Sequence, residues 1–325
     1  MSEDTEWAIP ETAQPRADEW AFDLERALAS VVAVRAEIPG DAFTASILGT
    51  ERAGNGVVID QSGLILTIGY LITEADSIWL TALNGAAAPA HVVGYDQTTG
   101  FGLVQALGRL GAPPLELGTA AATAVGDAVI IAGEGGLPHA LKAVVVSKRE
   151  FAGYWEYVLD EALFTSPPHP SWGGAACIGA DGRLQGVGSL FVQEARGEGI
   201  ASQGNMIVPI DLLKPIQNDL LTLGRVDQPP RPWLGMYTSE TEDTVFVAGV
   251  ATGGPADRAG IKPGDFVLEV AGARVTDLAA TFRRVWAVGP AGSEIPLTIA
   301  RDGSLHRVTI HSADRNDFLK KPRLH

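Results

Sequence analysis

The chain has 325 residues, of which 46% are hydrophobic and 19% charged, so it contains enough apolar surface to fold rather than remain disordered. At about 150 residues per domain, this length predicts two domains. The formal charge is −15 at pH 7, and a chain this negative repels phosphate backbones, which argues against nucleic acid as a partner. Cys177 is the single cysteine, so an intrachain disulfide framework and a cysteine-rich metal cage are excluded.

Residues 1–27 form an acidic arm, in which eight of residues 1–25 are acidic and one is basic. The arm lacks the positive start and apolar core of a secretory signal, and no later apolar run reaches the roughly 18 residues of a membrane-spanning helix. We therefore expect a cytoplasmic protein without a membrane span, and an extracytoplasmic location stays open if the N-terminus has been trimmed. The rings of Trp7, Trp20 and Phe22 predict docking, either on the chain's own body or on another subunit of a homo-oligomer or hetero-complex.

Short apolar segments bounded by turn residues fill residues 53–210, as in the run G-V-V-I-D at 56–60. Their β-branched residues and their spacing predict an antiparallel barrel or sandwich. Two helices are predicted beside these strands. One covers residues 17–34, where apolar residues recur every three or four positions, and the other covers residues 211–223 and ends at Gly224.

A second domain follows residues 225–232, which contain three prolines in eight positions and predict a stiff linker. Beyond the linker, strands are predicted over 245–250, 266–270 and 296–300, and a helix over 277–288. We expect a small α+β domain of roughly 80 residues.

Motifs for cofactors and metals are missing from the sequence. It contains neither a phosphate-binding G-x-x-x-x-G-K-[ST] loop nor a G-x-G-x-x-G turn between a strand and a helix. The six histidines are scattered and form no H-E-x-x-H pair. We therefore predict no cofactor and no metal.

Several short motifs occur in a characteristic order: G-N-G-V-V-I-D at 54–60, G-L-I-L-T at 63–67, V-G-Y-D at 93–96, W-G-G at 172–174 and D-G-R-L-Q-G-V at 181–187. Each motif alone is weak, but their order and spacing together resemble the HtrA/Deg family. In that family a trypsin-like serine protease domain of two β-barrels precedes a PDZ domain.

The resemblance implies a mainly β fold in five parts. An arm at 1–27 precedes a trypsin-like double β-barrel over 28–224, and the linker at 225–232 leads to a small α+β PDZ domain over 233–312, which is followed by a tail at 313–325. Fold alone does not supply an activity, so the residues at the site decide the function.

The resemblance places three residues at the positions of the catalytic triad. Tyr70 stands where the family has the histidine base, and a phenol with a pKa of about 10 is a poor base at neutral pH. Gly100 stands at the aspartate position and has no carboxylate to orient an imidazole. Trp172 stands at the position of the nucleophilic serine, and an indole is not a nucleophile.

The oxyanion hole also differs from the family pattern. Pro170 occupies the position of one backbone N–H donor, and proline has no N–H. These substitutions predict a pseudoprotease rather than an enzyme. Such a protein would act as a scaffold or accessory subunit that recruits a protein partner.

Two alternatives remain open. Ser171 and His169 lie beside the nucleophile position, and a rearranged pair of the two would make the chain an active serine hydrolase. The second alternative is that the protein acts as a chaperone-like holdase. Asp96 precedes the vacant aspartate position and is predicted to be a turn residue, and Cys177 is predicted to be a small buried side chain rather than a reactive thiol.

The second domain carries stronger motifs. The run R-P-W-L-G-M at 231–236 is similar to the carboxylate-binding loop of HtrA-type PDZ domains, and G-P-A-D-R-A-G-I-K-P-G-D at 254–265 is similar to a second family motif. The resemblance implies that the backbone N–H groups of the loop bind a peptide carboxylate and that the peptide adds as a strand. The implied peptide-binding residues are Trp233, Leu234, Gly235, Met236, Phe282, Val285 and Trp286. The alternative for the last three is that their helix face only packs on the sheet.

Overall fold

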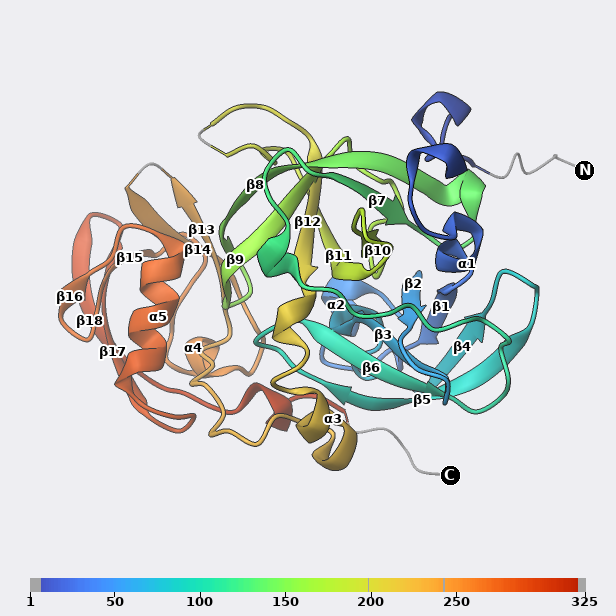
Figure 1. Cartoon of the computed structure of the whole chain (residues 1–325). Helices are drawn as coiled ribbons and strands as arrows, with labels where there is room; N and C mark the ends of the chain where they lie inside the picture. The colour runs from blue at the N-terminus through green and yellow to red at the C-terminus, as the bar shows by residue number, and fades with distance from the viewer. Residues whose placement is uncertain (1–6, 198, 242, 321–325) are drawn as a thin grey trace, which may run out of the picture. The chain divides into compact units, whose positions relative to one another are not determined.

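The computed structural model describes residues 7–197, 199–241 and 243–320 (Figure 1). The chain divides into two compact units. The first unit contains the chain up to residue 149, residues 161–226 and residue 320, and the second contains residues 150–160 and 227–319. Most of the predicted arm at 1–27 and of the predicted tail at 313–325 is therefore described. Residues 1–6 of the arm and 321–325 of the tail lie outside the described part of the chain.

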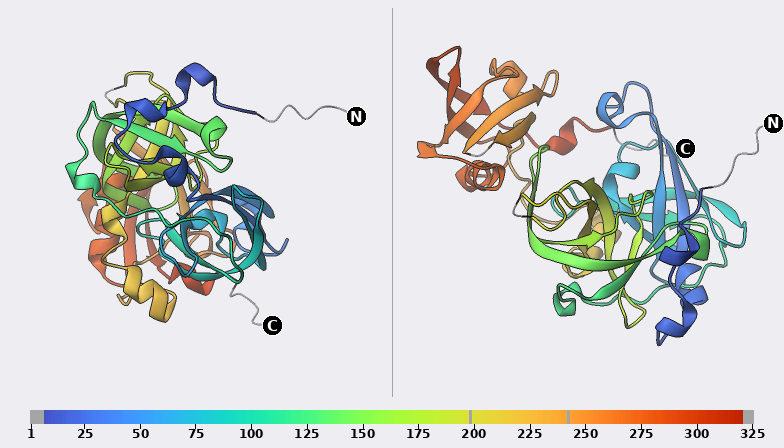
Figure 2. Two further views of the ribbon diagram at one scale, coloured as in Figure 1. Left: turned by 45° about the vertical axis from the view of Figure 1, so that its right-hand side comes forward. Right: turned by 90° about the horizontal axis from the view of Figure 1, so that it is seen from above.

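Two closed barrels form most of the first unit (Figure 2), although the ends of β8 and β9 within residues 150–160 belong to the second unit. The strands of the first barrel are β1 Val31–Glu37, β2 Glu51–Val58, β3 Leu64–Ile68, β4 Ser77–Thr81, β5 Ala87–Tyr95 and β6 Phe101–Ala106. They pair in the order β1-β2-β3-β6-β5-β4. The strands of the second barrel are β7 Ala128–Ala132, β8 Ala140–Gly153, β9 Tyr157–Ser166, β10 Ala176–Ile178, β11 Leu184–Val192 and β12 Gly204–Pro209. They pair in the order β10-β11-β12-β9-β8-β7.

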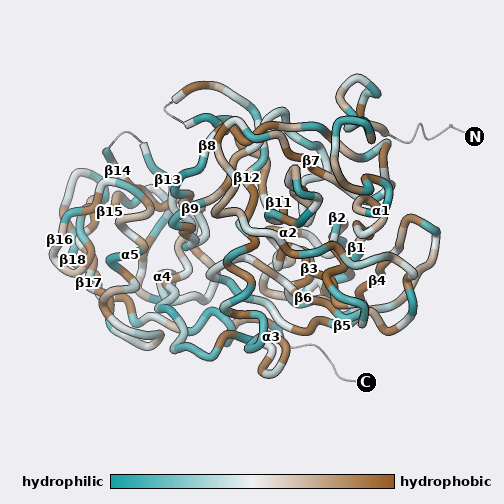
Figure 3. The backbone as a smooth tube through the Cα atoms, in the orientation of Figure 1, coloured by the Kyte–Doolittle hydropathy of each residue, from teal (hydrophilic) through white to brown (hydrophobic). Residues whose placement is uncertain are grey.

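The barrel strands follow the hydrophobic pattern of the sequence. In β4, Ile78 and Leu80 are buried while Trp79 between them is 52% exposed, as expected when successive side chains point to opposite faces. All five residues of β3 are buried. Figure 3 shows apolar stretches along the barrel strands. Of the two architectures that the sequence left open, the antiparallel barrel is the one observed, as the family resemblance implied.

Short helical segments connect the strands of the first unit. They are η1 Glu11–Ala13, η2 Ala17–Glu19, α1 Leu24–Leu28, α2 Ala45–Leu48, η3 Gly69–Leu71, η4 Ala120–Ala122, η5 Leu137–His139, η6 Ile210–Leu212 and α3 Gln217–Leu223. The predicted helix over 17–34 is wrong in extent: α1 has five residues, and β1 begins at Val31 because its β-branched run pairs with β2. The helix predicted over 211–223 is limited to α3, which ends at Gly224 in the left-handed conformation.

The second unit contains a sheet with the strand order β13-β14-β15-β17-β18, and β16 pairs with β15. Its strands are β13 Met236–Thr241, β14 Thr244–Val250, β15 Phe266–Val270, β16 Ala273–Arg274, β17 Glu294–Arg301 and β18 Ser304–His311. Its helical segments are α4 Pro255–Arg258, α5 Leu278–Val288 and η7 Arg315–Asp317. The predicted strands and the predicted helix of this region are confirmed. Asp277 caps α5, since its side chain accepts a hydrogen bond of 2.7 Å from the N–H of Ala280.

Candidate functional site

The loop before β13 holds a carboxylate on backbone N–H groups. The N–H groups of Leu234, Gly235 and Met236 donate to Glu156 Oε1 over 3.1, 2.7 and 3.1 Å, and Leu234 N also lies 3.0 Å from Oε2. Gly235 has a φ of +75°, a conformation that glycine adopts without strain and that turns successive N–H groups toward one point. The loop predicted to bind a carboxylate therefore has that geometry, and the carboxylate belongs to the same chain.

Glu156 lies in the turn between β8 and β9, with a φ of +61°. The residues around it, 150–160, belong to the second unit. The side chain is buried, and burial raises the pKa of Glu156 to about 7, although the loop N–H groups and the Arg315 guanidinium act to lower it. Glu156 carries no signal in the sequence, because its role depends on where the β8–β9 turn lies in three dimensions.

The hairpin turn also contacts the edge of β13. The N–H of Thr238 donates to the backbone oxygen of Tyr154 over 3.0 Å, which is a main-chain bond of the kind that an added strand makes. Val158 is buried in the same hydrophobic cluster as Leu234 and Met236. The hairpin thus supplies a carboxylate, a backbone acceptor and an apolar side chain to one groove.

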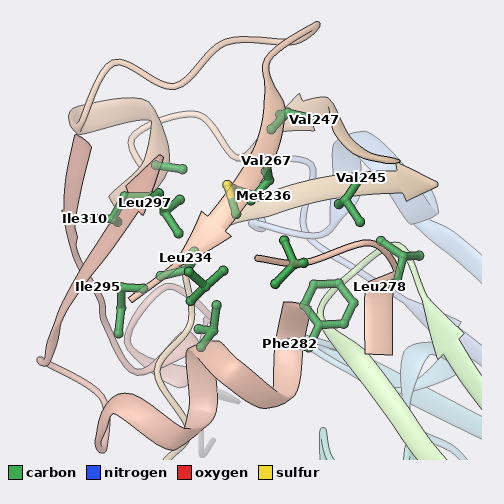
Figure 4. Close-up of a cluster of buried hydrophobic side chains, with 14 of the residues drawn as sticks. Leu234, Met236, Val245, Val247, Val267, Leu278, Phe282, Ile295, Leu297 and Ile310 are labelled. Carbon is green, nitrogen blue, oxygen red and sulfur yellow. The ribbon is translucent and has the colours of Figure 1, made fainter. Parts of the chain in front are cut away.

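Helix α5 packs on the sheet beside this groove. Phe282 and Val285 are each 1% exposed and belong to the buried cluster of the second unit, and Figure 4 shows Phe282 near Leu278 on the helix. Trp286 is half-buried against the same cluster, and the Arg231 guanidinium lies 4.1 Å from the center of its ring system. The face of α5 therefore packs on the sheet, and the predicted role of Phe282, Val285 and Trp286 in lining a peptide pocket stays a prediction.

An arginine of α5 binds both strands of the hairpin. Arg283 Nη1 lies 2.5 Å from Glu150 Oε2, and Nη2 lies 2.5 Å from Asp160 Oδ1. Glu150 is in β8 and Asp160 is in β9, so the two ion pairs hold the two sides of the turn. Arg283 and Glu150 are about half exposed and Asp160 is 93% exposed, so each pair contributes at most about 1 kcal/mol.

The three predicted triad positions come together in the first unit. The Tyr70 hydroxyl donates to the backbone oxygen of Ser189 over 2.9 Å, and the Trp172 side chain is a further hydrogen-bond partner of Tyr70. The backbone oxygen of Gly100 accepts from the N–H of Gly69, next to Tyr70, over 2.7 Å. Burial raises the pKa of the Tyr70 phenol, so it stays protonated at neutral pH and acts as a donor.

The predicted pair of Ser171 and His169 is not assembled as a nucleophile and base. His169 Nδ1 accepts from the backbone N–H of Ser171 over 3.1 Å, and its Nε2 lies 3.0 Å from the backbone oxygen of His139. Both ring nitrogens are therefore engaged away from the Ser171 hydroxyl, which contacts Asn55 Nδ2 at 3.2 Å. Burial lowers the pKa of His169, which favours the neutral ring. Pro170 lies between the two residues.

Two further predictions about single residues are confirmed. Asp96 is a turn residue whose Oδ2 accepts from the N–H of Thr99 over 2.8 Å. Cys177 is completely buried in β10, and burial raises its pKa to about 12, so the thiol stays protonated.

The aromatic residues of the arm contact the chain's own body. The ring of Trp7 stacks on His139 at 4.3 Å between centroids, and its backbone oxygen lies 2.8 Å from His139 Nε2. Trp20 lies 5.8 Å from Phe22, which is close to Gly182. Trp7 remains 44% exposed, so a subunit contact through the arm stays a prediction.

Within the described part of the chain, no group of three or more His, Cys, Asp or Glu side chains is arranged to hold a metal ion. Among the helices of residues 7–320 that the structure describes, none is long and apolar enough to cross a membrane.

Comparison with known families identifies two different domains in the chain. Residues 54–187 match the trypsin-like peptidase domain, and residues 232–311 match the PDZ domain. The boundary between the units, at residues 226 and 227, falls within the linker predicted at 225–232.

Curated relatives include the serine protease PepD of Mycobacterium tuberculosis, 28% identical over 75% of this chain, and the serine protease Do-like HtrA of Bacillus subtilis, 23% identical over 86% of it. The chain spans 57% of PepD and 69% of the Bacillus protein. Among solved structures, the HtrA-type protease AlgW with a decapeptide covers 92% of this chain with a TM-score of 0.52 and 20% identity, and the chain covers 98% of it. The serine endoprotease from Yersinia pestis covers 90% with a TM-score of 0.51 and 22% identity, and 98% of that chain is covered.

These comparisons correct one prediction. The chain was expected not to be an enzyme, but its relatives are named serine proteases and endoproteases, which points to an enzyme. The expectation rested on the residues at four aligned positions, Tyr70, Gly100, Trp172 and Pro170. Substitutions at aligned positions do not by themselves establish that a protein has no activity.

Proposed function

We propose that this HtrA/DegP-like protein binds the carboxyl-terminal segments of other protein chains in the groove of its PDZ domain. One observation carries the proposal: three consecutive N–H groups, of Leu234, Gly235 and Met236, converge on a single carboxylate. A loop that binds one carboxylate in this way fits another, because the donors belong to the backbone and do not depend on the rest of the ligand.

The elements beside the loop suit an extended peptide. The N–H of Thr238 faces outward from β13 and bonds a backbone oxygen, so the strand edge accepts an added strand. The buried cluster under the loop accepts an aliphatic side chain, as it does with Val158. A peptide would then be held by its terminal carboxylate, its backbone and its last side chain, with a Kd in the range of about 1 μM that such short contacts reach.

A similar fold supports the proposal. AlgW, the HtrA-type protease noted above, was solved with a decapeptide. We extend peptide binding to this chain on the strength of its own carboxylate-binding loop, and not on the likeness alone.

The fate of the captured segment is part of the proposal. It is processed by the barrel unit, in line with the names of the relatives, or it is retained as a partner, in line with a scaffold role. Mass spectrometry of the bound peptide after incubation distinguishes the two, because processing yields fragments and retention leaves the peptide intact.

The test of binding compares decapeptides that end in Val, Leu, Ile or Phe with the same peptides as carboxyl-terminal amides. Hydrogen bonds to a charged group contribute about 1.5–3 kcal/mol each, so we expect the amides to bind at least tenfold more weakly. Equal binding of acid and amide would show that the loop is not the binding site.

The loop itself is tested by Gly235→Ala. A Cβ at Gly235 would lie 3.1 Å from the Trp233 side chain and 3.3 Å from Ala251, and the positive φ adds about 1–2 kcal/mol of strain. The matched control is Gly272→Ala, which has a φ of +77° but open space around its Cβ position. We expect the first variant, and not the second, to lose peptide binding about tenfold.

A further inference from the structure

The peptide groove of the second unit is filled by the turn of the β8–β9 hairpin. We call residues 154–158, Tyr154 to Val158, the hairpin tip. They belong to the same unit as the groove, although β8 and β9 are strands of the second barrel. The groove is thus covered by a part of the chain that is distant in sequence. Glu156, which accepts a hydrogen bond from Leu234, lies 78 positions before it.

The tip occupies every contact that a carboxyl-terminal peptide needs. Glu156 Oε1 takes the N–H groups of the carboxylate-binding loop, with the shortest distance of 2.7 Å to Gly235. The backbone oxygen of Tyr154 takes the N–H of Thr238 on the edge of β13. Val158 takes the apolar position in the buried cluster. A peptide and the tip cannot be bound at the same time.

The contacts that hold the hairpin tip in the groove are of a kind that allows the tip to be released. Its carboxylate is buried against three backbone donors, but its base is held by the partly exposed ion pairs of Arg283 with Glu150 and Asp160. Exposed pairs contribute little, and the rings of Tyr154 and Trp155 contact each other and the rings of Phe151, Tyr157 and Tyr237. The three bonds to Glu156 are therefore the strongest polar link that has to break.

We propose that the hairpin tip is a displaceable internal ligand, which keeps the peptide groove closed until a carboxyl-terminal segment takes the place of Glu156. This inference rests on the proposed function, because it assumes that the groove binds such segments. The apparent Kd of a peptide then equals its intrinsic Kd divided by the fraction of molecules with an open groove. If the open fraction is about 1–10%, the tip weakens binding about 10- to 100-fold.

The variant Glu156→Ala removes the carboxylate from the tip in the full chain. Its matched control is Glu116→Ala, which removes an exposed carboxylate in the first unit, 77% exposed and paired with Arg183. Binding of the decapeptides ending in Val, Leu, Ile or Phe is measured for both variants and the unmodified chain. We expect Glu156→Ala to bind them at least tenfold more tightly than the other two, and circular dichroism checks that it is folded.

The outcomes separate the two proposals. If the free-acid peptides bind neither the unmodified chain nor Glu156→Ala, the proposed function is wrong. If they bind all three proteins with Kd values within twofold, the groove binds peptides but the tip does not close it, and this inference is overturned.

A second measurement does not depend on any variant. Hydrogen exchange of the unmodified chain is followed with and without a saturating free-acid decapeptide. Displacement predicts faster exchange of the amides in the hairpin tip when the peptide is bound, while the loop amides of Gly235 and Met236 stay protected by the new carboxylate. Unchanged or slower exchange in the tip would overturn the inference.

Discussion

Closure of the groove should depend on pH through Glu156. In the docked tip the pKa of Glu156 is raised to about 7, mainly by burial, from an ordinary value of 4.5. A raised carboxyl pKa means that the docked state holds a proton more tightly than the released state. Docking is therefore favoured below about pH 4.5 and weakens as the pH rises toward 7, above which it changes no further.

The magnitude follows from the shift. A difference of about 2.5 pKa units corresponds to about 3 kcal/mol, or a factor of roughly 300 in the docking equilibrium. The Arg315 guanidinium and the loop N–H groups act to lower this pKa, but burial outweighs them. The effect on binding is smaller than 300-fold once the open fraction approaches one.

The assay measures the Kd of one free-acid decapeptide at pH 5 and at pH 8 for the unmodified chain and for Glu156→Gln. At each pH, the Kd of the unmodified chain is divided by the Kd of Glu156→Gln. This ratio isolates Glu156, because titration of the peptide and of the other groups affects both proteins. We expect the ratio to fall at least tenfold from pH 5 to pH 8. A ratio that stays constant or rises with pH would refute the reasoning.

Three further predictions concern stability and reactivity, and calorimetry or thiol titration checks them. Asp277→Ala removes the cap of α5 and should cost about 1 kcal/mol in the melting transition of the second unit. Glu74→Ala should cost about 3 kcal/mol in the first unit, because Glu74 accepts from the N–H groups of Phe43 and Thr44 and from the Thr44 hydroxyl. Cys177 should not react with an aromatic disulfide reagent until the first unit unfolds, and rapid reaction of the native chain would contradict its burial.

The contribution of Glu74 also has a pH dependence of opposite sign. Burial acts to raise the pKa of Glu74, but the N–H groups of Lys320, Thr44 and Phe43 and the Thr44 hydroxyl outweigh it and lower the pKa. The stabilisation is present above pH 4.5 and is lost as the pH falls through the lowered value. Acid should therefore destabilise the first unit in the unmodified chain more than in Glu74→Ala.

Local patterns in the sequence predicted much of this fold. The apolar runs in the barrels and the helix predicted over 277–288 depend on neighbours within a few residues, so the sequence contains the information directly. The helix predicted over 17–34 failed for the opposite reason. Val31 and its neighbours have the spacing of a helix face, but pairing with β2, about 25 residues later, makes them a strand.

The residues of the candidate site also differ in whether the sequence predicted their roles. The carboxylate-binding loop was predicted from the resemblance of the contiguous run at 231–236 to a family motif, and its backbone supplies the donors. Glu156 was not predictable, because its role depends on where the β8–β9 turn lies in three dimensions. Ser171 and His169 show that closeness in sequence does not by itself make a nucleophile and a base. Both ring nitrogens of His169 are hydrogen-bonded to backbone groups instead.

The tether between the tip and its groove explains how so short a contact could keep the groove closed. A tethered ligand has an effective concentration in the range of about 1 mM, so an intrinsic tip affinity of only about 10–100 μM would leave roughly 1–10% of grooves open. A glutamate side chain suffices at that affinity, although it lacks the adjacent strand end of a true carboxyl terminus. Because Glu156 competes for the same three N–H groups, a partner must bring a terminal carboxylate of its own to gain more from the loop than the tip loses. The internal ligand would thus reject chains that offer the groove only an apolar strand, and selectivity for carboxyl termini would follow from the competition itself.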